Sequence, residues 1–376
     1  MEKHRITSRD KIISFLRGDK CEQVPIWMLF PYHHAGYYTD VLSNPYYKDI
    51  TAAALDNAIW LNRRNTGVPT FSDDVEIITE SFVNSDEHIS KTFYRFNGME
   101  LWTENRLGGS GGPKTRKMIN SEEELEIFSK FPLFPTEKIS EVLNPQLENI
   151  RKEAVEFPDE LGLMMLDLGE PIGVIYYSSN LEEMSIWSLT CPDLVVSILD
   201  NLMIRYREIY RIAIESNAAP VFFSVGSELA SPPMVSVDTF RRWIVPYAAE
   251  INKMIHDDNK WIIQHYHGQI KEILPYFLDM APDALHTIEA PPIGNCTFTE
   301  AFNIVGDKIG LIGNIQYDEF QRLTPDEMEM AVKNVIDECK GKRLMLSPSA
   351  GPYEAVLTSR QQENYLRFIQ AGVKYG

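Results

Sequence analysis

The second half of the chain repeats one arrangement of hydrophobic and polar positions. A short apolar run ends in polar residues or glycine, an amphipathic helical pattern follows, and then the next apolar run begins. Runs that are hydrophobic at nearly every position are typical of strands in a parallel sheet whose two faces are both covered. We therefore expect five parallel strands here, at 220–228, 260–268, 283–292, 308–316 and 342–352.

Helical patterns fill the gaps, and the clearest is the segment TPDEMEMAVKNVIDECKGK. Thr324 is expected to cap this helix, Pro325 suits its first position, and Glu327 stands where a capping box needs its acidic partner. Apolar side chains then recur at helical spacing as far as Gly341, which predicts one buried face. Strands and helices therefore alternate through this half.

The first half offers three further candidate strands, at 23–31, 68–78 and 161–171. Eight strands alternating with helices over this length predict an α/β fold, a single-domain (β/α)8 TIM barrel over residues 1–376. A doubly wound open sheet is the competing architecture. An N-terminal helix at 8–17 and a C-terminal helix at 359–373 are expected to pack outside the barrel.

A different pattern occupies the stretch between Ser81 and Asn120. HISKTFYRF and MELWTENR alternate hydrophobic and polar residues as short strands do, and GGSGG follows at 108–112. We expect a β insertion over the barrel mouth with a mobile tip. A phosphate-binding role for the glycines is not favoured, because Pro113 intervenes and no helix begins there.

Composition and charge narrow the class of protein. The 376 residues are 44% hydrophobic and 24% charged, which suits a globular chain with a large core. No apolar run approaches the length of a membrane helix and the start lacks the pattern of a signal peptide, so a cytoplasmic protein with no membrane partner is expected. Four scattered cysteines favour free thiols, and a net charge of −18 argues against nucleic acid as a partner.

Two histidines stand two positions apart at the end of an apolar run, in WIIQHYHGQI. His265 and His267 would project from the same face of a strand, and active sites of such barrels form where strands end. One zinc ion can therefore bind both, and Gly268 leaves space beside them. Two buried histidines that are hydrogen-bonded to neighbours are an equally good interpretation of so short a pattern.

Acidic residues follow neighbouring strands at comparable depth. They are candidate metal ligands or hydrogen-bond acceptors for the imidazoles: Glu228, Glu289 and Glu354. Glu289 is the strongest candidate, because an acid between two apolar residues at a strand end is costly without a partner. For Glu354, the alternative to a metal ligand is a solvated position in a loop.

A tyrosine-rich segment, PYHHAGYYTDVLSNPYY, follows the first candidate strand at 31–47. Hydroxyl-bearing aromatic side chains suit a flat and partly polar ligand, and a tyrosine-rich surface loop is the alternative. FSDD at 71–74 adds two acids at the end of another candidate strand region.

Several segments together resemble the uroporphyrinogen decarboxylase superfamily over nearly the whole chain. They are SRDKIISFLRGD followed by VPIW, then FSDD, SPPMVSVDTFRRWIVPY, and the closing GNIQ, TPDE and EN elements. The resemblance implies a (β/α)8 barrel. It also implies one of two activities, cofactor-free decarboxylation or zinc-dependent methyl transfer together with a corrinoid protein.

The decarboxylases carry an arginine-rich MRQAGR segment, because their substrate presents eight carboxylates. Here the matching letters are HHAGYY, so His33 and His34 replace arginine and glutamine, and Tyr37 or Tyr38 replaces the second arginine. Asp73 resembles the essential aspartate of that branch, yet an acidic pocket without guanidinium groups would repel a polycarboxylate. The resemblance therefore does not extend to porphyrinogen decarboxylation.

The methyltransferases carry an HxCG motif and a later SPGCG-like segment. Here HYHG and SPSAG match them, so His265 is retained, His267 replaces one cysteine and Ala350 stands at the other. The zinc shell would have to be rebuilt from histidines and carboxylates. Such a harder shell suits polarising an oxygen atom better than delivering a thiolate.

We therefore expect a substrate:corrinoid-protein methyltransferase that demethylates an O- or N-methyl compound, such as an aromatic methyl ether. Its cofactors would be Zn²⁺ and a cobalamin on a separate corrinoid protein, because DEHISK at 86–91 lacks the glycine of a corrinoid-binding DxHxxG segment. The substrate would contact Tyr32, Tyr37, Tyr38 and Asn314, with His33, His34 or Asp73 as proton donor.

Two other functions stay open at this point. One is a decarboxylase or lyase of a smaller acid that uses Asp73, and the other is a binding barrel without catalysis. Metal content separates them from the methyltransferase. The sequence does not determine the oligomeric state, and a homodimer stays open.

Overall fold

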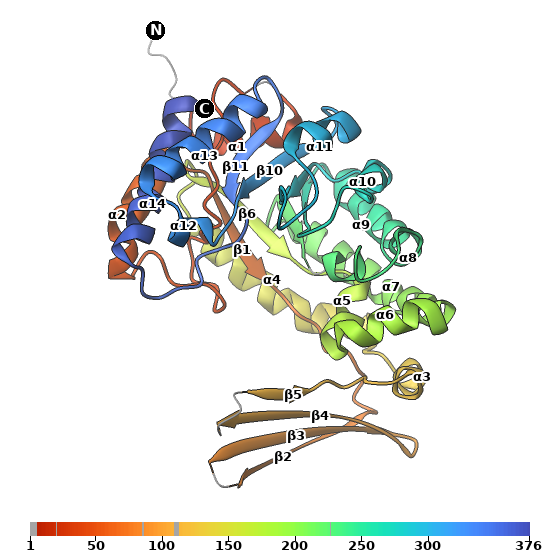
Figure 1. The fold of residues 1–376 in the computed structure, drawn as a ribbon. Coiled ribbons are helices and arrows are strands. Elements are labelled where there is room, and N and C mark those ends of the chain that lie inside the picture. Colours follow the sequence, from red (N-terminus) through yellow and green to blue (C-terminus); the bar gives the residue numbers. More distant parts are fainter. Residues whose placement is uncertain (1–5, 20, 85, 109–112, 226) are drawn as a thin grey trace.

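Seven parallel strands form one curved sheet, in the order β1-β6-β7-β8-β9-β10-β11 (Figure 1). The computed structural model describes residues 6–19, 21–84, 86–108, 113–225 and 227–376. The strands are β1 Trp60–Asn65, β6 Gly162–Asp167, β7 Val221–Ser224, β8 Trp261–His265, β9 Ala284–His286, β10 Gly310–Ile315 and β11 Leu344–Pro348. Six of them lie within runs that the hydrophobic pattern predicts.

A short extended segment closes this sheet into a barrel. The amide of Trp27 donates to the carbonyl of Leu346 at 2.8 Å, and the amide of Ile59 donates to the carbonyl of Ile26 at 2.8 Å. Both pairings are parallel, so the segment lies between β11 and the start of β1 and occupies the eighth position. The expected (β/α)8 barrel is confirmed, and the open doubly wound sheet is not formed.

The expected strand at 68–78 does not belong to the barrel. Its last residues begin β2, Glu76–Asn84, which is part of a separate antiparallel sheet. The barrel strand is β1, whose sequence WLNRRN is apolar only at its start. Its polar second half breaks the hydrophobic pattern because those side chains bind polar partners at the mouth and on helix α4, Ile139–Glu156.

The helices surround the sheet and follow the strands in alternation (Figure 1). Thr324 caps α13 with a complete capping box, as its sequence predicts. Besides α4, the helices are α1 Ser8–Arg17, α2 Lys48–Asn57, α3 Glu122–Lys130, α5 Pro171–Ser178, α6 Leu181–Thr190, α7 Pro192–Glu215, α8 Val237–Trp243, α9 Val245–Asp257, α10 Leu274–Met280, α11 Phe298–Val305, α12 Glu319–Arg322, α13 Pro325–Glu338 and α14 Ser359–Tyr375.

Apolar side chains pack in two layers, one inside the barrel and one between the strands and the surrounding helices. The inner layer includes Met165 and Phe223 from the strands and Phe15 from α1. A Cβ atom on Gly310 would lie 2.6 Å from the ring of Phe15, so this glycine lets α1 approach β10 closely. Because α1 packs against the starts of the strands, the opposite end of the barrel is available for a site.

The insertion forms a four-stranded antiparallel sheet in the order β2-β3-β4-β5. After β2 come β3 Glu87–Phe96, β4 Met99–Gly108 and β5 Lys114–Arg116. The sheet lies beyond α3 at the end of the molecule toward which β1 runs (Figure 1). It therefore projects on the mouth side of the barrel. Of the glycine segment at 108–112 that was weighed for phosphate binding, Gly108 ends β4, and residues 109–112, with the expected mobile tip, lie outside the described residues.

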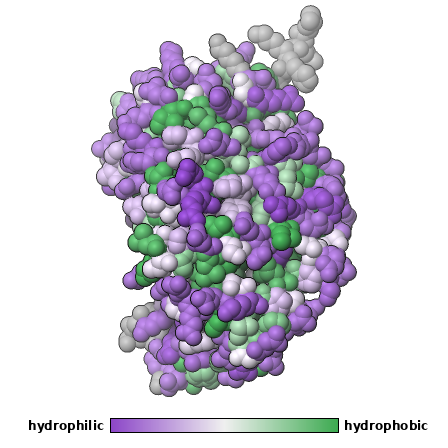
Figure 2. Space-filling model, turned by 90° about the vertical axis from the view of Figure 1, so that its right-hand side faces the viewer, coloured by the Kyte–Doolittle hydropathy of each residue, from purple (hydrophilic) through white to green (hydrophobic). Residues whose placement is uncertain are grey.

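The face shown in Figure 2 is largely hydrophilic, with hydrophobic residues in small separate patches. This agrees with the high content of charged residues in the chain. Among the described helices, none is by itself long and apolar enough to cross a membrane. Only α6 and α7 taken together reach that length and composition, and they are bent by 112° relative to each other.

Candidate active site

Polar side chains gather inside the barrel at the C-terminal ends of its strands. Ile263 and Met345 belong to the apolar inner layer, so His265 and Ser347, two residues further along their strands, face the same interior. Asn314 is the register partner of Ser347, and its amide donates to the carbonyl of Ile288 at 2.5 Å. These polar side chains therefore share one rim, at the C-terminal ends of the strands.

The two histidines of the HxH motif lie side by side at this rim, with ring centroids 4.5 Å apart. His265 lies at the end of β8, and His267 follows after one residue. Both side chains are partly exposed, so a ligand in the mouth can approach them. Their shared face is as the period of a strand predicts.

His265 is held by a third histidine that the sequence analysis did not select. Its Nδ1 lies 2.6 Å from Nδ1 of His286 on β9, and the two rings are stacked. Nε2 of His286 lies 3.0 Å from the carbonyl oxygen of Pro348, which can only accept a hydrogen bond. His286 therefore donates from Nε2 and accepts at Nδ1, His265 donates from Nδ1, and Nε2 of His265 keeps its lone pair.

Both stacked histidines are neutral. Burial lowers the pKa of His286 to about 3. Burial and the neighbouring His286, His267 and Arg63 hold the pKa of His265 well below its ordinary value. A neutral imidazole with a free lone pair is the form that binds zinc. His265 is therefore ready to act as a ligand through Nε2.

His267 is oriented by Glu289. Its Nδ1 lies 3.2 Å from one carboxylate oxygen of Glu289, whose other oxygen accepts the amide proton of Gly268 at 2.6 Å. Burial alone would raise the pKa of Glu289, but these hydrogen bonds outweigh it and lower the pKa. Gly268 has φ of 79°, in the left-handed region that favours glycine, and a Cβ there would meet open space. Its conformation directs the amide to the carboxylate.

The other two acids proposed as ligands differ in position. Burial alone would lower the pKa of His267, but Glu289 and, more weakly, the charge of Glu228 raise it, so Glu228 acts on this site from the short helix Ser227–Ala230. Glu354 instead accepts a hydrogen bond from Tyr317. In the part of the chain that the structure describes, no three His, Cys, Asp or Glu side chains form a group able to hold a metal ion.

An arginine and an aspartate stand beside the histidines in the same interior. Arg63 of β1 forms an ion pair with Asp167 of β6, and both side chains are largely buried. The guanidinium also lies 4.8 Å from the ring centroid of Phe223, whose ring is 5.7 Å from that of His265. Nε of Arg63 has no hydrogen-bond partner among the described residues. The mouth therefore contains a cation close to the histidine pair.

Tyr37 and Tyr38 cover this arginine. The ring of Tyr37 lies 5.1 Å from the guanidinium carbon of Arg63, and the two tyrosine rings are 4.5 Å apart. Burial raises the pKa of Tyr37 to about 12, so its hydroxyl keeps its proton. A Cβ atom on Gly351 would lie 2.3 Å from the Tyr38 ring, so the glycine of the SPSAG segment makes room for this tyrosine. These two tyrosines therefore line the mouth.

The first residues of the tyrosine-rich segment lie elsewhere. The ring of Tyr32 packs on Trp60 and Phe157, in the layer between the strands and the helices. His33 shares hydrogen bonds with Asn62, which is buried, and its Nε2 faces Glu156. The structure therefore does not bring Tyr32 and His33 to the histidine pair. The chain turns between them and Tyr37.

His34 and Asp73 are also apart from the pair. Nε2 of His34 lies 3.0 Å from the carbonyl oxygen of Tyr38, and its side chain is exposed. The side chain of Asp73 is 83% exposed and its carboxylate pairs with Lys138 at 3.2 Å. A carboxylate in that position is solvated at the surface, where it has no contact with the barrel mouth.

Glu170 is a further acid that sequence reasoning missed. It is buried between β6 and α5, where Ser224 and Ser227 donate hydrogen bonds to its two oxygens. Burial raises its pKa by more than the hydrogen bonds from Ser224, Ser227 and Gln264 lower it. Glu170, Arg63, Asp167 and His286 were missed because each is recognisable only by its partner. For Arg63 and Asp167 that partner is 104 positions away.

Comparison with known proteins places the whole chain among barrels of this kind. The family model described as Uroporphyrinogen decarboxylase (URO-D) matches residues 98–375, more than half of the chain. A solved methyltransferase from Methanosarcina mazei is similar over 99% of this chain and 99% of its own, with a TM-score of 0.60 and 16% sequence identity. That likeness supports the fold.

Two other solved structures are less similar. The match to a B12-independent methionine synthase from Shewanella sp. W3-18-1 covers 61% of this chain and 65% of the synthase chain, with 12% sequence identity and a TM-score of 0.39. The match to a D-psicose 3-epimerase from Clostridium cellulolyticum H10 covers 67% of this chain and 92% of the epimerase chain, with 10% sequence identity and a TM-score of 0.37. A search of curated protein sequences gave no match.

Proposed function

This chain belongs to the uroporphyrinogen decarboxylase family, and on that premise we propose that it is the substrate-side methyltransferase of a corrinoid-dependent system. Its substrate is an O- or N-methyl compound, and the methyl acceptor is a cobalamin on a separate protein. The proposal is carried by the hydrogen-bond chain from Pro348 through His286 to His265. That chain leaves one neutral imidazole nitrogen free beside His267, at the end of the barrel where active sites form.

The donor set fits zinc at two positions. Nε2 of His265 is free, and the contact of His267 with Glu289 through Nδ1 leaves the other nitrogen of that ring for a ligand. The described residues bring no third His, Cys, Asp or Glu side chain into a group with these two histidines. We assign the third position to Glu228, whose charge already acts on His267 and whose side chain would have to move toward the pair when zinc binds. When bound, zinc supplies a Lewis acid for the heteroatom from which the methyl group departs.

The remaining groups of the mouth bind and orient the substrate. The Tyr37 ring lies over Arg63, and the Tyr38 ring meets it edge-on at 61°. A cavity of about 300 Å³ is lined by Asn65, which contacts Tyr37, and by Asp167, which pairs with Arg63. The Tyr37 hydroxyl stays protonated and donates to Oδ1 of Asn65 at 3.3 Å, a contact that it would exchange for a departing oxygen atom of the substrate. We assign this role to Tyr37 rather than to His33, His34 or Asp73, none of which faces the histidine pair.

The test is a transfer assay with a panel of methylated compounds. The purified, zinc-supplemented chain is mixed with a reduced corrinoid protein and with methoxylated aromatics, betaines or methylamines, and formation of methylcobalamin is followed by absorbance. We expect one class to methylate the corrinoid, and His265→Ala to abolish this. His88→Ala is the matched control, because His88 is an exposed histidine of the insertion.

The same assay tests the decarboxylase alternative. Carbon dioxide released from an aromatic acid by the chain alone, without corrinoid methylation by any compound, would refute the methyltransferase proposal. Asp73 is the residue on which that alternative depends. If instead Asp73→Asn methylates the corrinoid as fast as the wild type does, Asp73 has no role in catalysis, as its exposed position already indicates.

A further inference from the structure

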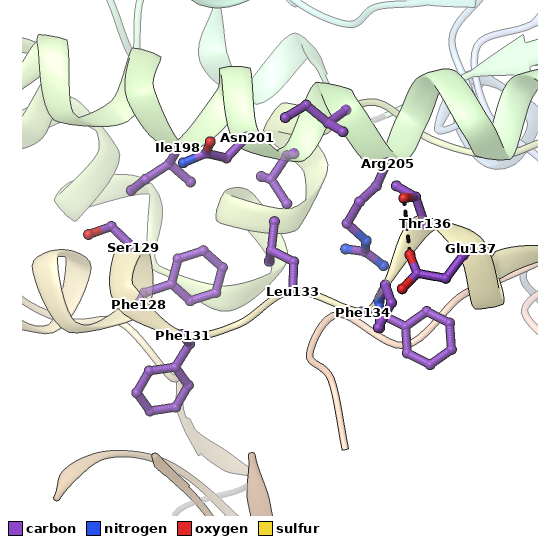
Figure 3. Close-up of a pocket in the computed structure, with 13 residues that line it drawn as sticks. Phe128, Ser129, Phe131, Leu133, Phe134, Thr136, Glu137, Ile198, Asn201 and Arg205 are labelled. Carbon is purple, nitrogen blue, oxygen red and sulfur yellow. Dashed lines mark hydrogen bonds between the residues drawn. The ribbon is translucent and has the colours of Figure 1, made fainter. Parts of the chain in front are cut away.

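A second cavity lies outside the barrel, between α7 and the segment that follows α3 (Figure 3). Its volume is about 370 Å³, which lies in the range of small-molecule sites. None of the residues that line this cavity follows a barrel strand, so the cavity is separate from the barrel mouth. The proposed methyl transfer does not use it.

The walls of this cavity are mainly apolar. Phe128 and Leu133 point toward α7, and Ile198 faces them from that helix (Figure 3). Phe131, Phe134 and Leu202 complete the apolar lining. Such a surface favours the hydrocarbon part of a ligand, since burying apolar area is favourable at about 25 cal/mol per Å².

One charged side chain interrupts this lining. Arg205 of α7 extends into the cavity and is only 5% exposed (Figure 3). One terminal nitrogen donates to the carbonyl oxygen of Pro69, whereas its buried Nε has no hydrogen-bond partner among the described residues. Burial lowers the pKa of Arg205, and the one titratable group that acts on it is the Tyr206 hydroxyl. No described carboxylate pairs with it.

A buried guanidinium without an acidic partner is unfavourable, and an anion that reaches it removes that cost. The planar group also matches a carboxylate, which can accept two of its protons. Glu137 lines the same cavity, but it is exposed and its carboxylate contacts the Thr136 hydroxyl at 3.4 Å. It therefore marks the solvent side of the site, and Arg205 marks the buried side.

We propose that this cavity binds a small amphipathic carboxylate, with its carboxyl group on Arg205 and its hydrocarbon part against the phenylalanines. The ligand enters from the side of Glu137. Arg205 also donates to Pro69, so the residue that holds the carboxyl group is linked to the connection that leads from β1 to the insertion. The site is thus a ligand site in addition to the barrel mouth.

Binding of octanoate to the full chain, measured by isothermal titration calorimetry, tests the proposal. Octanol and octylammonium are the matched probes, since they share the hydrocarbon but lack the negative charge. We expect one saturable octanoate site with an affinity at least about tenfold above that of octanol. Equal affinities for octanoate and octanol, or no octanoate binding, would overturn the proposal.

Variants locate the site. Arg205→Met and Ser129→Trp are expected to weaken octanoate binding at least about tenfold, because the first removes the cation and the second fills the cavity at its rim. Glu126→Trp, on the same helix as Ser129 but outside the lining, should bind octanoate as the wild type does. The Ser129 variant leaves Arg205 intact, so it also tests the site should Arg205→Met misfold.

One more pair of variants separates this site from the mouth. Glu137→Gln removes a negative charge beside the cavity and is expected to strengthen octanoate binding. His265→Ala should leave octanoate binding unchanged even though it abolishes the proposed methyl transfer. Loss of octanoate binding in His265→Ala with retention in Arg205→Met would place the carboxylate in the mouth and refute the inference.

Discussion

The Nδ1 atoms of His265 and His286 lie 2.6 Å apart across adjacent strands. The proton between them belongs to His265, because His286 donates its only N–H, at Nε2, to the carbonyl oxygen of Pro348. A buried residue outside the HxH motif therefore determines which nitrogen of His265 is available. This relationship decides how the barrel mouth can bind a metal, and the first prediction tests it.

Replacing His286 by leucine should weaken zinc binding without removing any proposed ligand. His265 would lose the acceptor that fixes its tautomer and ring orientation, and loss of such a partner costs about 10- to 100-fold in metal affinity. A competition titration with a chromophoric chelator measures the affinity. His88→Ala serves as the control, and an unchanged affinity in His286→Leu would show that the stacked histidine has no orienting role.

Metal content should depend on His265 but not on Asp73. After incubation with zinc and removal of excess metal, the wild type should retain about one equivalent, and His265→Ala should retain close to none. Asp73→Asn should match the wild type, because Asp73 is exposed and pairs with Lys138. Elemental analysis of the folded proteins gives the result. Equal zinc in the wild type and His265→Ala would argue against the site.

Gly268→Ala should destabilise the fold by about 1 kcal/mol, because φ of 79° is unfavourable for alanine even where a Cβ has open space. The amide that donates to Glu289 would also shift. Urea denaturation measures the free energy of unfolding. Gly36→Ala is the matched control, since its Cβ also meets open space but its φ lies outside the left-handed range. The interpretation fails if both substitutions have the same effect.

The stabilising effect of Glu170→Gln should grow with pH. Burial raises the pKa of Glu170, so the folded chain keeps a proton that the unfolded chain loses above its ordinary pKa of about 4.3. The free energy of unfolding of the wild type therefore falls as pH rises from that value toward the folded pKa. Glutamine carries no such titration.

Denaturation of both proteins between about pH 5 and pH 8 measures this difference. We expect the stability of Glu170→Gln relative to the wild type to increase across the range. A difference that is constant, or that decreases as pH rises, would mean that Glu170 is ionised in the folded chain throughout.

The sequence alone determined those features that depend on local periodicity. Six strands, the capped helix at Thr324 and the antiparallel insertion follow from the spacing of apolar residues, because spacing decides which face of an element is buried. The shared face of His265 and His267 follows from the two-residue period of a strand in the same way. Their proximity therefore required no knowledge of the rest of the chain.

Tertiary structure decided everything that depends on partners distant in sequence. β1 has too few apolar residues to be recognised, because Arg63 and Asn65 face Asp167 in the mouth instead of a hydrophobic core. Residues close in sequence also lie apart in the structure, since Tyr32 packs on Phe157 and Tyr37 lies over Arg63. The chain turns between them, and a turn leaves no periodic signal in the sequence.

The same reason explains the two sites. In the sequence, His286 is indistinguishable from an ordinary buried residue, and only the position of β9 brings it against His265. Arg205 is likewise one polar position of a helix, and only the packing of the folded chain buries it without a carboxylate partner. Sequence spacing reports which face a side chain occupies. Only the folded chain determines which charges and hydrogen-bonding groups are in contact there. Those contacts join different elements, and the local sequence pattern does not specify how these elements are arranged in space.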